Sequence, residues 1–244
     1  MLKVQNVSVA YRGMSALEDV SFSLAAGATL AVVGESGAGK STLIRAILGL
    51  VKCSHGNVTW SGDPVSQHRP ALVMQEPRSS FNPRLALRHC VMEPLTAQRI
   101  SIDHDRMASF CDSLDIAPDL LSRRPAQVSI GQAQRVGILR ALIASPPLIL
   151  FDEPLSALDA VTQKHTAQMI CDLQSREGFA ALIVTHDLGY AAAHADHIAV
   201  LRGGRIEELA TARTFVEAPQ SAYARKLRDA AFELGALGRM EHAV

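Results

Sequence analysis

The sequence predicts an α/β fold built on a largely parallel sheet, and two features of its pattern lead to that prediction. The short apolar run 29–33 stops at a glycine-rich segment, after which apolar residues recur at helical spacing. The apolar runs 148–151 and 180–184 show no polar alternation, which is typical of strands covered on both faces. Such strands need helices on both sides of the sheet, and the stretches between them are compatible with helices.

Composition limits the class of protein. At roughly 150 residues per domain, the chain of 244 residues is one large domain, or one domain with a modest lobe. Hydrophobic residues make up 48% and charged residues 20%, which is ordinary globular composition and excludes intrinsic disorder. The formal net charge is +0, so the balance favours neither nucleic acid nor an anionic membrane as the main partner.

The cysteines and the hydropathy indicate the compartment. Cys53, Cys90, Cys111 and Cys171 lie far apart without metal-site spacing, so we expect separate reduced thiols. No apolar run approaches the roughly 20 residues that span a bilayer, and the N-terminus lacks the apolar core of a signal peptide. We therefore expect a protein on the cytoplasmic side, peripheral if it acts at a membrane.

The first elements follow from the pattern in chain order. Residues 2–9 alternate as a strand should, and a second strand over 20–24 ends at the turn Ala26-Gly27. The run 29–33 is a third strand. After Ser41, apolar residues at three- and four-residue spacing up to Val51 predict a helix.

The middle and the end of the chain have a different pattern. Residues 76–140 show few strand signals and several helix-compatible stretches punctuated by prolines, so this part is predicted to be a mostly helical lobe. The tail, 211–244, is polar and helix-compatible, with a break at Pro219.

The glycine-rich segment 34–41 fits the pattern G-x-x-x-x-G-K-[ST] between a strand and a helix. Glycines allow backbone N–H groups to surround phosphate oxygens, and the helix N-terminus adds positive potential. Lys40 can then reach the terminal phosphates, and the Ser41 hydroxyl can bind Mg²⁺. The segment predicts that the chain binds a magnesium nucleotide.

Two strand ends carry further candidate residues. Asp152 follows the run 148–151, where a carboxylate can hold Mg²⁺ through its water shell. Glu153 is either a base that polarises water or a solvated charge at a helix start. His186 follows the run 180–184, and a histidine there is either structural or part of the nucleotide site.

The motifs resemble those of one family, the ATP-binding subunits of ABC transporters. Residues 128–132, V-S-I-G-Q, resemble the ABC signature L-S-G-G-Q and lie between the phosphate loop and Asp152-Glu153. Gln75 resembles the Q-loop glutamine, residues 156–159 resemble the D-loop, and His186 resembles the switch histidine of the H-loop. Tyr11 stands where the family places an aromatic side chain on adenine.

The resemblance implies a set of site residues. Catalysis is assigned to Glu153 as general base, His186 as stabiliser of the γ-phosphate and Gln75, while Mg²⁺ is assigned to Ser41, Gln75 and Asp152. Binding of ATP is assigned to Tyr11, Gly34, Glu35, Ser36, Gly37, Ala38, Gly39, Lys40, Ser41, Thr42, Ser129, Gly131, Gln132 and Asp159.

The resemblance also implies an architecture and partners. We expect a P-loop NTPase (RecA-like) core over 1–75 and 141–210, with a mixed sheet and an N-terminal antiparallel β region. A helical signature subdomain is expected over 76–140, and a tail over 211–244. Two such subunits, either two different ones or two copies of this chain, would dimerise head to tail on two membrane permeases at the cytoplasmic face of the bacterial inner membrane. Residues after Gln75 would contact a permease helix, among them Arg78, Phe81 and Arg84.

The signature departs from the family pattern at Ile130, where the family has glycine. A β-branched residue disfavours positive φ and would crowd an approaching phosphate, so we expect an effect on the partner's site. A nucleotide-gated regulatory subunit with weak hydrolysis therefore remains an alternative.

A finer resemblance concerns the cargo. The segments 75–84, 93–95 and 219–227 are similar to motifs of the peptide/nickel importer subfamily, which is fed by an extracytoplasmic binding protein. They imply import of short peptides, nickel or a metal-chelating small molecule. The alternatives are another transport system, an ABC protein acting on nucleic acid or ribosomes, and a P-loop kinase. The last two lack support, since the chain has no long coiled coil and a kinase has no use for a signature.

Overall fold

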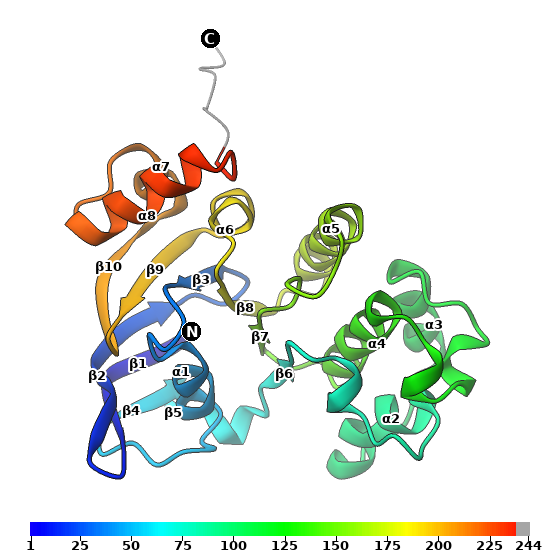
Figure 1. Ribbon diagram of the computed structural model, residues 1–244. Helices are drawn as coiled ribbons and strands as arrows, with labels where there is room; N and C mark the ends of the chain where they lie inside the picture. The colour runs from blue at the N-terminus through cyan, green and yellow to red at the C-terminus, as the bar shows by residue number, and fades with distance from the viewer. Residues whose placement is uncertain (238–244) are drawn as a thin grey trace. The chain divides into compact units, whose positions relative to one another are not determined.

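The computed structural model describes residues 1–237, and the chain divides into two compact units. The first unit comprises residues 1–68 and the chain from residue 180 onward, and the second comprises residues 69–179. The elements of both units are labelled in Figure 1.

An antiparallel sheet opens the first unit, with strand order β2-β1-β4-β5. Arg12 and Gly13 form the two-residue turn of the first hairpin, both with positive φ (49° and 84°), as the twist of a tight hairpin requires. The strands are β1 (Leu2–Tyr11), β2 (Met14–Leu24), β4 (His55–Trp60) and β5 (Asp63–Pro64). The predicted N-terminal antiparallel β region is confirmed.

A second sheet in the same unit carries the predicted parallel strands. β3 lies between β8 and β9 and is parallel to both, whereas β10 is antiparallel to β9, so the sheet is mixed. Val33 at the end of β3 is aligned with Thr185 of β8 and Val200 of β9. Every residue of β3 and β8 is buried, which explains their continuous apolar runs. The strands are β3 (Thr29–Val33), β8 (Ala180–Thr185), β9 (His197–Arg202) and β10 (Arg205–Thr211).

The first unit has four α-helices among its described residues: α1 (Lys40–Ile47), α6 (Leu188–His194), α7 (Ala212–Glu217) and α8 (Ala222–Glu233). A short 3₁₀ helix also spans Val65–His68. The predicted helix up to Val51 is too long, because Gly49 adopts φ 70° and ends α1. The amides of Gly49 and Leu50 donate to the carbonyls of Ala46 and Arg45, which is the Schellman pattern.

The second unit is mostly helical, as predicted for residues 76–140. Its parallel strands β6 (Ala71–Val73) and β7 (Leu148–Asp152) accompany α2 (Leu87–Gln98), α3 (His104–Ser113), α4 (Ile130–Leu142) and α5 (Ala160–Glu177). Three 3₁₀ turns span Arg78–Ser80, Leu120–Ser122 and Pro125–Gln127. Pro94 lies inside α2 and does not separate two helices.

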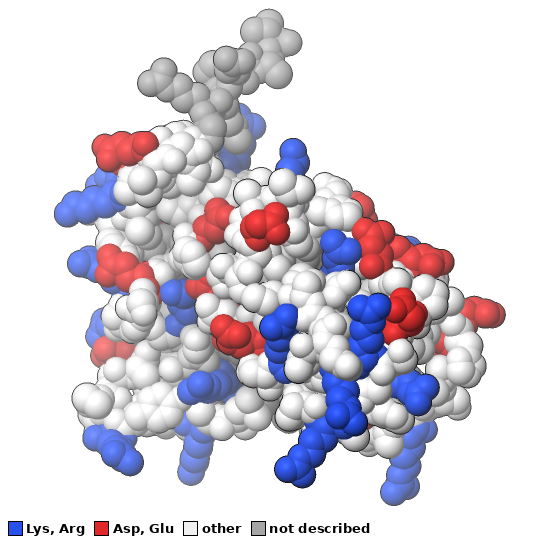
Figure 2. All heavy atoms as spheres, turned by 45° about the vertical axis from the view of Figure 1, so that its right-hand side comes forward, with Lys and Arg blue, Asp and Glu red and all other residues white. Residues whose placement is uncertain are grey.

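The surface agrees with the balanced composition. On the face shown in Figure 2, acidic and basic side chains are interspersed over the middle and upper parts, whereas the side chains along the lower edge are basic. Within residues 1–237, no helix is both long enough and apolar enough to cross a bilayer.

Candidate functional site

The glycine-rich loop 34–39 joins the buried strand β3 to helix α1 in the first unit. Lys40 is the first residue of α1, and its ammonium group donates to the carbonyl of Gly34 at 2.7 Å and to that of Glu35 at 3.0 Å. The lysine is thus held over the loop, where it can meet the phosphates of a bound nucleotide.

Two of the loop glycines lie against backbone. A Cβ at Gly34 would be 2.2 Å from the Leu201 carbonyl, and one at Gly39 would be 2.7 Å from the Ala16 carbonyl. Gly39 also has φ 108°, a conformation that side chains with a Cβ rarely adopt. The neighbouring strands therefore fix the shape of the loop, and the G-x-x-x-x-G spacing is a packing requirement.

His186 lies at the same sheet edge as this loop. Thr185 pairs with Val33, so the loop and His186 leave neighbouring parallel strands side by side. The Thr185 hydroxyl accepts from the Asp187 amide at 3.0 Å, and the Asp187 carboxylate caps α6 by accepting from the Tyr190 amide at 2.9 Å. His186 is an exposed side chain between two anchored residues, which favours a role in the site over a structural one.

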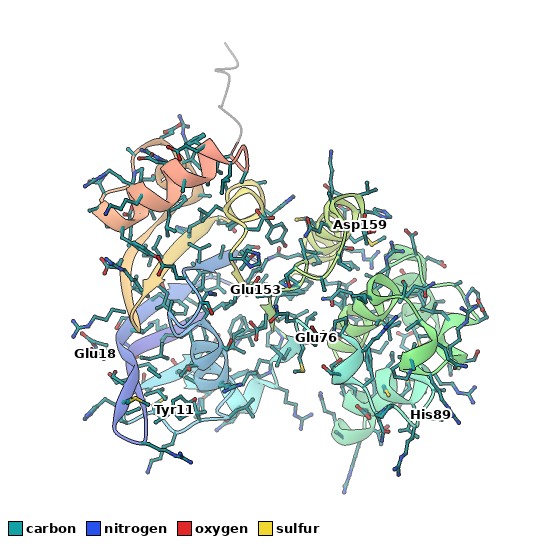
Figure 3. The ribbon with its side chains drawn as sticks, in the orientation of Figure 1. Tyr11, Glu18, Glu76, His89, Glu153 and Asp159 are labelled. Atoms are coloured by element: carbon teal, nitrogen blue, oxygen red, sulfur yellow. The ribbon has the colours of Figure 1, made fainter. Side chains whose placement is uncertain are left out.

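The second unit brings Gln75 and Glu153 together. Val73 pairs with Phe151, so both side chains follow neighbouring parallel strands at the same level. The Gln75 amide donates to the Ser156 hydroxyl at 3.4 Å, and that hydroxyl donates to the Glu153 carbonyl at 3.1 Å. Figure 3 shows Glu153 near the end of β7. The Q-loop, the strand-end carboxylates and the D-loop are therefore one connected group.

Glu153 is one of nine non-glycine residues with positive φ within residues 1–237. Its φ is 49°, in the left-handed region that a residue with a long side chain adopts at a cost of about 1–2 kcal/mol. Strained residues of this kind cluster at functional sites, where the surrounding structure holds them. Glu153 is not a charge at a helix start, because α5 begins only at Ala160.

The signature residues form the start of α4. The Ser129 hydroxyl accepts from the Gln132 amide at 3.1 Å while the Gln132 side chain accepts from the Ser129 amide at 2.9 Å, a complete capping box. A Cβ at Gly131 would lie 3.2 Å from the Thr162 methyl group, so the signature packs tightly against the start of α5.

Ile130 does not have the positive φ that a β-branched residue disfavours. Ile130 is the first residue of α4 and is absent from the residues with positive φ, because the capping box places this position in the helix. Its side chain is 41% exposed. The steric effect of Ile130 on an approaching phosphate stays a prediction.

Asp159 caps the following helix. Its carboxylate accepts from the amides of Val161 and Thr162 and from the Thr162 hydroxyl, and these hydrogen bonds from Thr162 lower the pKa of Asp159. The carboxylate remains exposed and charged at neutral pH. Figure 3 places it at the start of α5, while Tyr11, 40% exposed, lies at the end of β1.

The segment after Gln75 differs from expectation. Phe81 is only 4% exposed and lies under the Arg140 guanidinium at 4.8 Å, so it cannot offer its ring to a permease. Arg78 donates to the Val128 carbonyl, which ties the segment to the signature. Arg84 is exposed. Sequence reasoning missed Arg140, which also donates to the Ser80 carbonyl at 2.7 Å, because a basic residue inside a helical stretch carries no such signal.

These features define a class. A buried strand, a glycine loop followed by a lysine at a helix start, and an exposed histidine directly after the adjacent strand form a nucleotide-binding ATPase domain. The second unit adds a strand-end carboxylate pair and a capped signature helix.

Comparisons with known proteins agree with that class. Residues 17–156 match the ABC transporter family. The chain is 35% identical to the oligopeptide transport ATP-binding proteins OppF of Escherichia coli and Salmonella typhimurium, over 89% of this chain and 69% of each relative. A dimeric ATP-binding cassette solved in a post-hydrolysis state with ADP and phosphate superimposes with a TM-score of 0.78 at 28% identity, covering 87% of this chain and 99% of that one.

The chain belongs to the ABC transporter family and is an ATP-binding, ATP-hydrolysing subunit of it. The predicted α/β fold with a nucleotide-binding core is confirmed.

Proposed function

We propose that this ATPase powers an importer of short peptides. The observation that carries the proposal is the 35% identity to the OppF proteins, whose names describe oligopeptide transport. The motif similarity over 75–84, 93–95 and 219–227 supports the same subfamily. Nickel or a metal-chelating small molecule is the alternative cargo within that subfamily.

Residues of each unit have a proposed part in hydrolysis. Residues 34–42 bind the phosphates, with Lys40 neutralising their charge, and Tyr11 stacks on the adenine. Glu153 accepts a proton from the attacking water, and His186 stabilises the γ-phosphate as charge develops. Gln75, hydrogen-bonded to Ser156, links this step to the segment that precedes the signature.

Mg²⁺ fits the proposed donors. Ser41, Gln75 and Asp152 provide hydroxyl, amide and carboxylate oxygens, the ligands that Mg²⁺ prefers, and it usually takes one or two carboxylates plus substrate phosphates. The bound ion would neutralise charge on the β- and γ-phosphates. Ser41 at the first turn of α1 and Asp152 at the end of β7 are the two residues we assign most directly to it.

The proposed assembly contains further subunits. Ser129, Gly131 and Gln132 of one ATPase face the nucleotide of a second ATPase, and the pair sits on two permeases at the cytoplasmic face of the membrane. A substrate-binding protein delivers the cargo from the other side. Within this assembly, we propose that each ATPase subunit of this kind consists of a core (1–75, 141–210), a helical subdomain (76–140) and a tail (211–244).

The test is capture from membranes of the native host with a tagged Glu153→Gln chain and Mg-ATP. We expect a second ATPase, two permeases and a binding protein, with uptake of labelled short peptides lost in cells that carry the variant. Lys40→Ala is the matched control, because it should lose ATP binding and with it the complex held by ATP. Recovery of ribosomes or DNA-bound proteins without a permease would contradict the importer, and binding without turnover in the complete complex would favour a regulatory subunit.

A further inference from the structure

The C-terminal helices complete the core behind the nucleotide loop. Side chains of α7 and α8 belong to one apolar cluster with residues of β3, β9 and α6. That cluster includes Val33, the residue directly before the loop, and Leu188, two residues after His186. Figure 1 shows α6, α7 and α8 close to one another beside β9 and β10. The tail therefore packs on both elements that carry the nucleotide contacts of this unit.

The start of α8 is firmly anchored. The carboxylate of Glu208 on β10 is only 8% exposed and accepts from the amides of Gln220 at 2.9 Å and Ser221 at 2.7 Å. The Ser221 hydroxyl then caps the helix by accepting from the Ala224 amide at 3.0 Å. At the far end of the tail, a Cβ at Gly189 would lie 2.3 Å from the Ala236 carbonyl, so the chain after α8 presses on α6. Contacts at both ends fix α8 in position.

Tyr223 is the polar residue that α8 places in this core. Its ring is 9% exposed and lies under the guanidinium of Arg202 at 4.5 Å. Arg202 follows Leu201, whose carbonyl is the backbone against which Gly34 packs. Tyr223 therefore shares a cluster with Val33, the residue before the nucleotide loop, and contacts the neighbour of the residue against which Gly34 packs.

The Tyr223 hydroxyl has an acidic neighbour on that loop. Burial and then the interaction with Glu35 raise the pKa of Tyr223, whereas Arg202 acts in the opposite direction. Within residues 1–237, the buried hydroxyl makes no hydrogen bond of standard geometry, so Glu35 is close to it without being fully bonded. A small movement of the loop would bring Glu35 into hydrogen-bonding distance of the buried Tyr223 hydroxyl, and leaving that hydroxyl without a partner is costly.

Glu35 is central to the loop. Its carbonyl accepts from the Lys40 ammonium at 3.0 Å and from the Ala38 amide at 3.2 Å. A contact that restrains the Glu35 side chain therefore also restrains the Glu35 carbonyl that orients Lys40. The side chain of Glu35 itself is exposed, and Tyr223 is the tail residue that interacts with it.

We propose that Tyr223 is a positioning residue for the nucleotide: through Glu35 it holds the phosphate-binding loop, so that helix α8 sets the affinity for ATP. This inference rests on the proposed role of residues 34–42 in binding the phosphates. It gives the C-terminal segment a part in the ATPase cycle in addition to covering the sheet.

The experiment compares purified full-length chains by fluorescent ATP-analogue binding, thermal unfolding and steady-state hydrolysis. Tyr223→Phe keeps the ring and removes only the hydroxyl. We expect the Kd and KM for ATP to rise about three- to tenfold, because the variant removes the polar interaction of the hydroxyl with the partly screened Glu35 carboxylate, with kcat and Tm little changed. Glu35→Gln should have a smaller effect, and adding Tyr223→Phe to Glu35→Ala should change the Kd no further.

Two controls separate the causes. Lys226→Ala changes an exposed residue of the same helix and should leave all three measurements unchanged. Lys40→Ala should abolish ATP binding, and retained binding would overturn the proposed role of the loop instead. An unchanged Kd in Tyr223→Phe, or a fall in Tm that accounts for the loss of affinity, would overturn the inference about Tyr223.

Discussion

At the scale of single residues, the nucleotide loop depends on positions where only glycine fits. Gly39 combines a positive φ with a neighbouring backbone carbonyl, whereas Gly62 has almost the same φ, 102°, with nothing within 4 Å of an added Cβ. The pair separates two effects that usually occur together, the conformational strain of a side chain and its collision with backbone.

Gly39→Ala should lower the free energy of unfolding by more than Gly62→Ala does. We expect about 1–3 kcal/mol for the strain common to both variants and a further loss for Gly39→Ala, because the Ala16 carbonyl must move. Denaturant unfolding of both variants measures the difference. Equal losses would mean that the loop yields to the new methyl group and that β2 does not fix its shape.

At the scale of elements, the signature helix begins with a complete capping box. Ser129→Ala removes the side chain that accepts from the Gln132 amide and should lower the free energy of unfolding by about 1 kcal/mol. The exposed Ser101 in the same unit provides the control, since Ser101→Ala removes a hydroxyl that caps no helix. Denaturant unfolding measures both, and equal stability of the two variants would show that Gln132 alone holds the start of α4.

Sequence reasoning predicted the elements with clear periodicity and missed several others. The buried strands at 29–33, 148–151 and 180–184 were predicted because parallel strands covered on both faces are apolar throughout. β10 was missed, because its residues follow no simple alternation. The stretch that forms α5 was predicted only as helix-compatible and without bounds, since its polar residues surround a narrow buried stripe that includes Ile170 and Leu173.

The site was predicted by motif, and the exceptions have physical causes. Residues 34–41, Asp152, Glu153 and His186 follow strand ends, where a parallel sheet gathers functional groups, so their positions could be inferred from the pattern. The helical conformation of Ile130 and the burial of Phe81 depend on the Ser129 capping box and on Arg140. Both depend on contacts of particular side chains, and the spacing of apolar residues carries no information about such contacts.

At the scale of the whole molecule, none of the four cysteines, all within residues 1–237, forms a disulfide. Burial raises the pKa of Cys53, Cys90, Cys111 and Cys171. A raised pKa lowers the fraction of thiolate at neutral pH, and the thiolate is the reactive form.

Native protein at pH 7.5 should therefore react with a thiol reagent such as DTNB more slowly than a free cysteine does. Cys90, which is 0% exposed, should react last. In guanidinium chloride without reductant, all four thiols should react at once. Rapid labelling of one native thiol, or fewer than four in the unfolded chain, would contradict this account of the interior.

At position 153, the left-handed backbone favours glycine for stability, whereas the proposed hydrolysis of ATP requires glutamate. Glycine would adopt the same φ without strain, so a chain selected for robustness alone would drift toward Glu153→Gly and lose its proposed base. Glutamate at this position carries the cost of the left-handed backbone, about 1–2 kcal/mol. Random mutagenesis screened only for heat resistance would therefore be expected to recover inactive proteins at residue 153, and directed evolution of this ATPase must select for hydrolysis at every round.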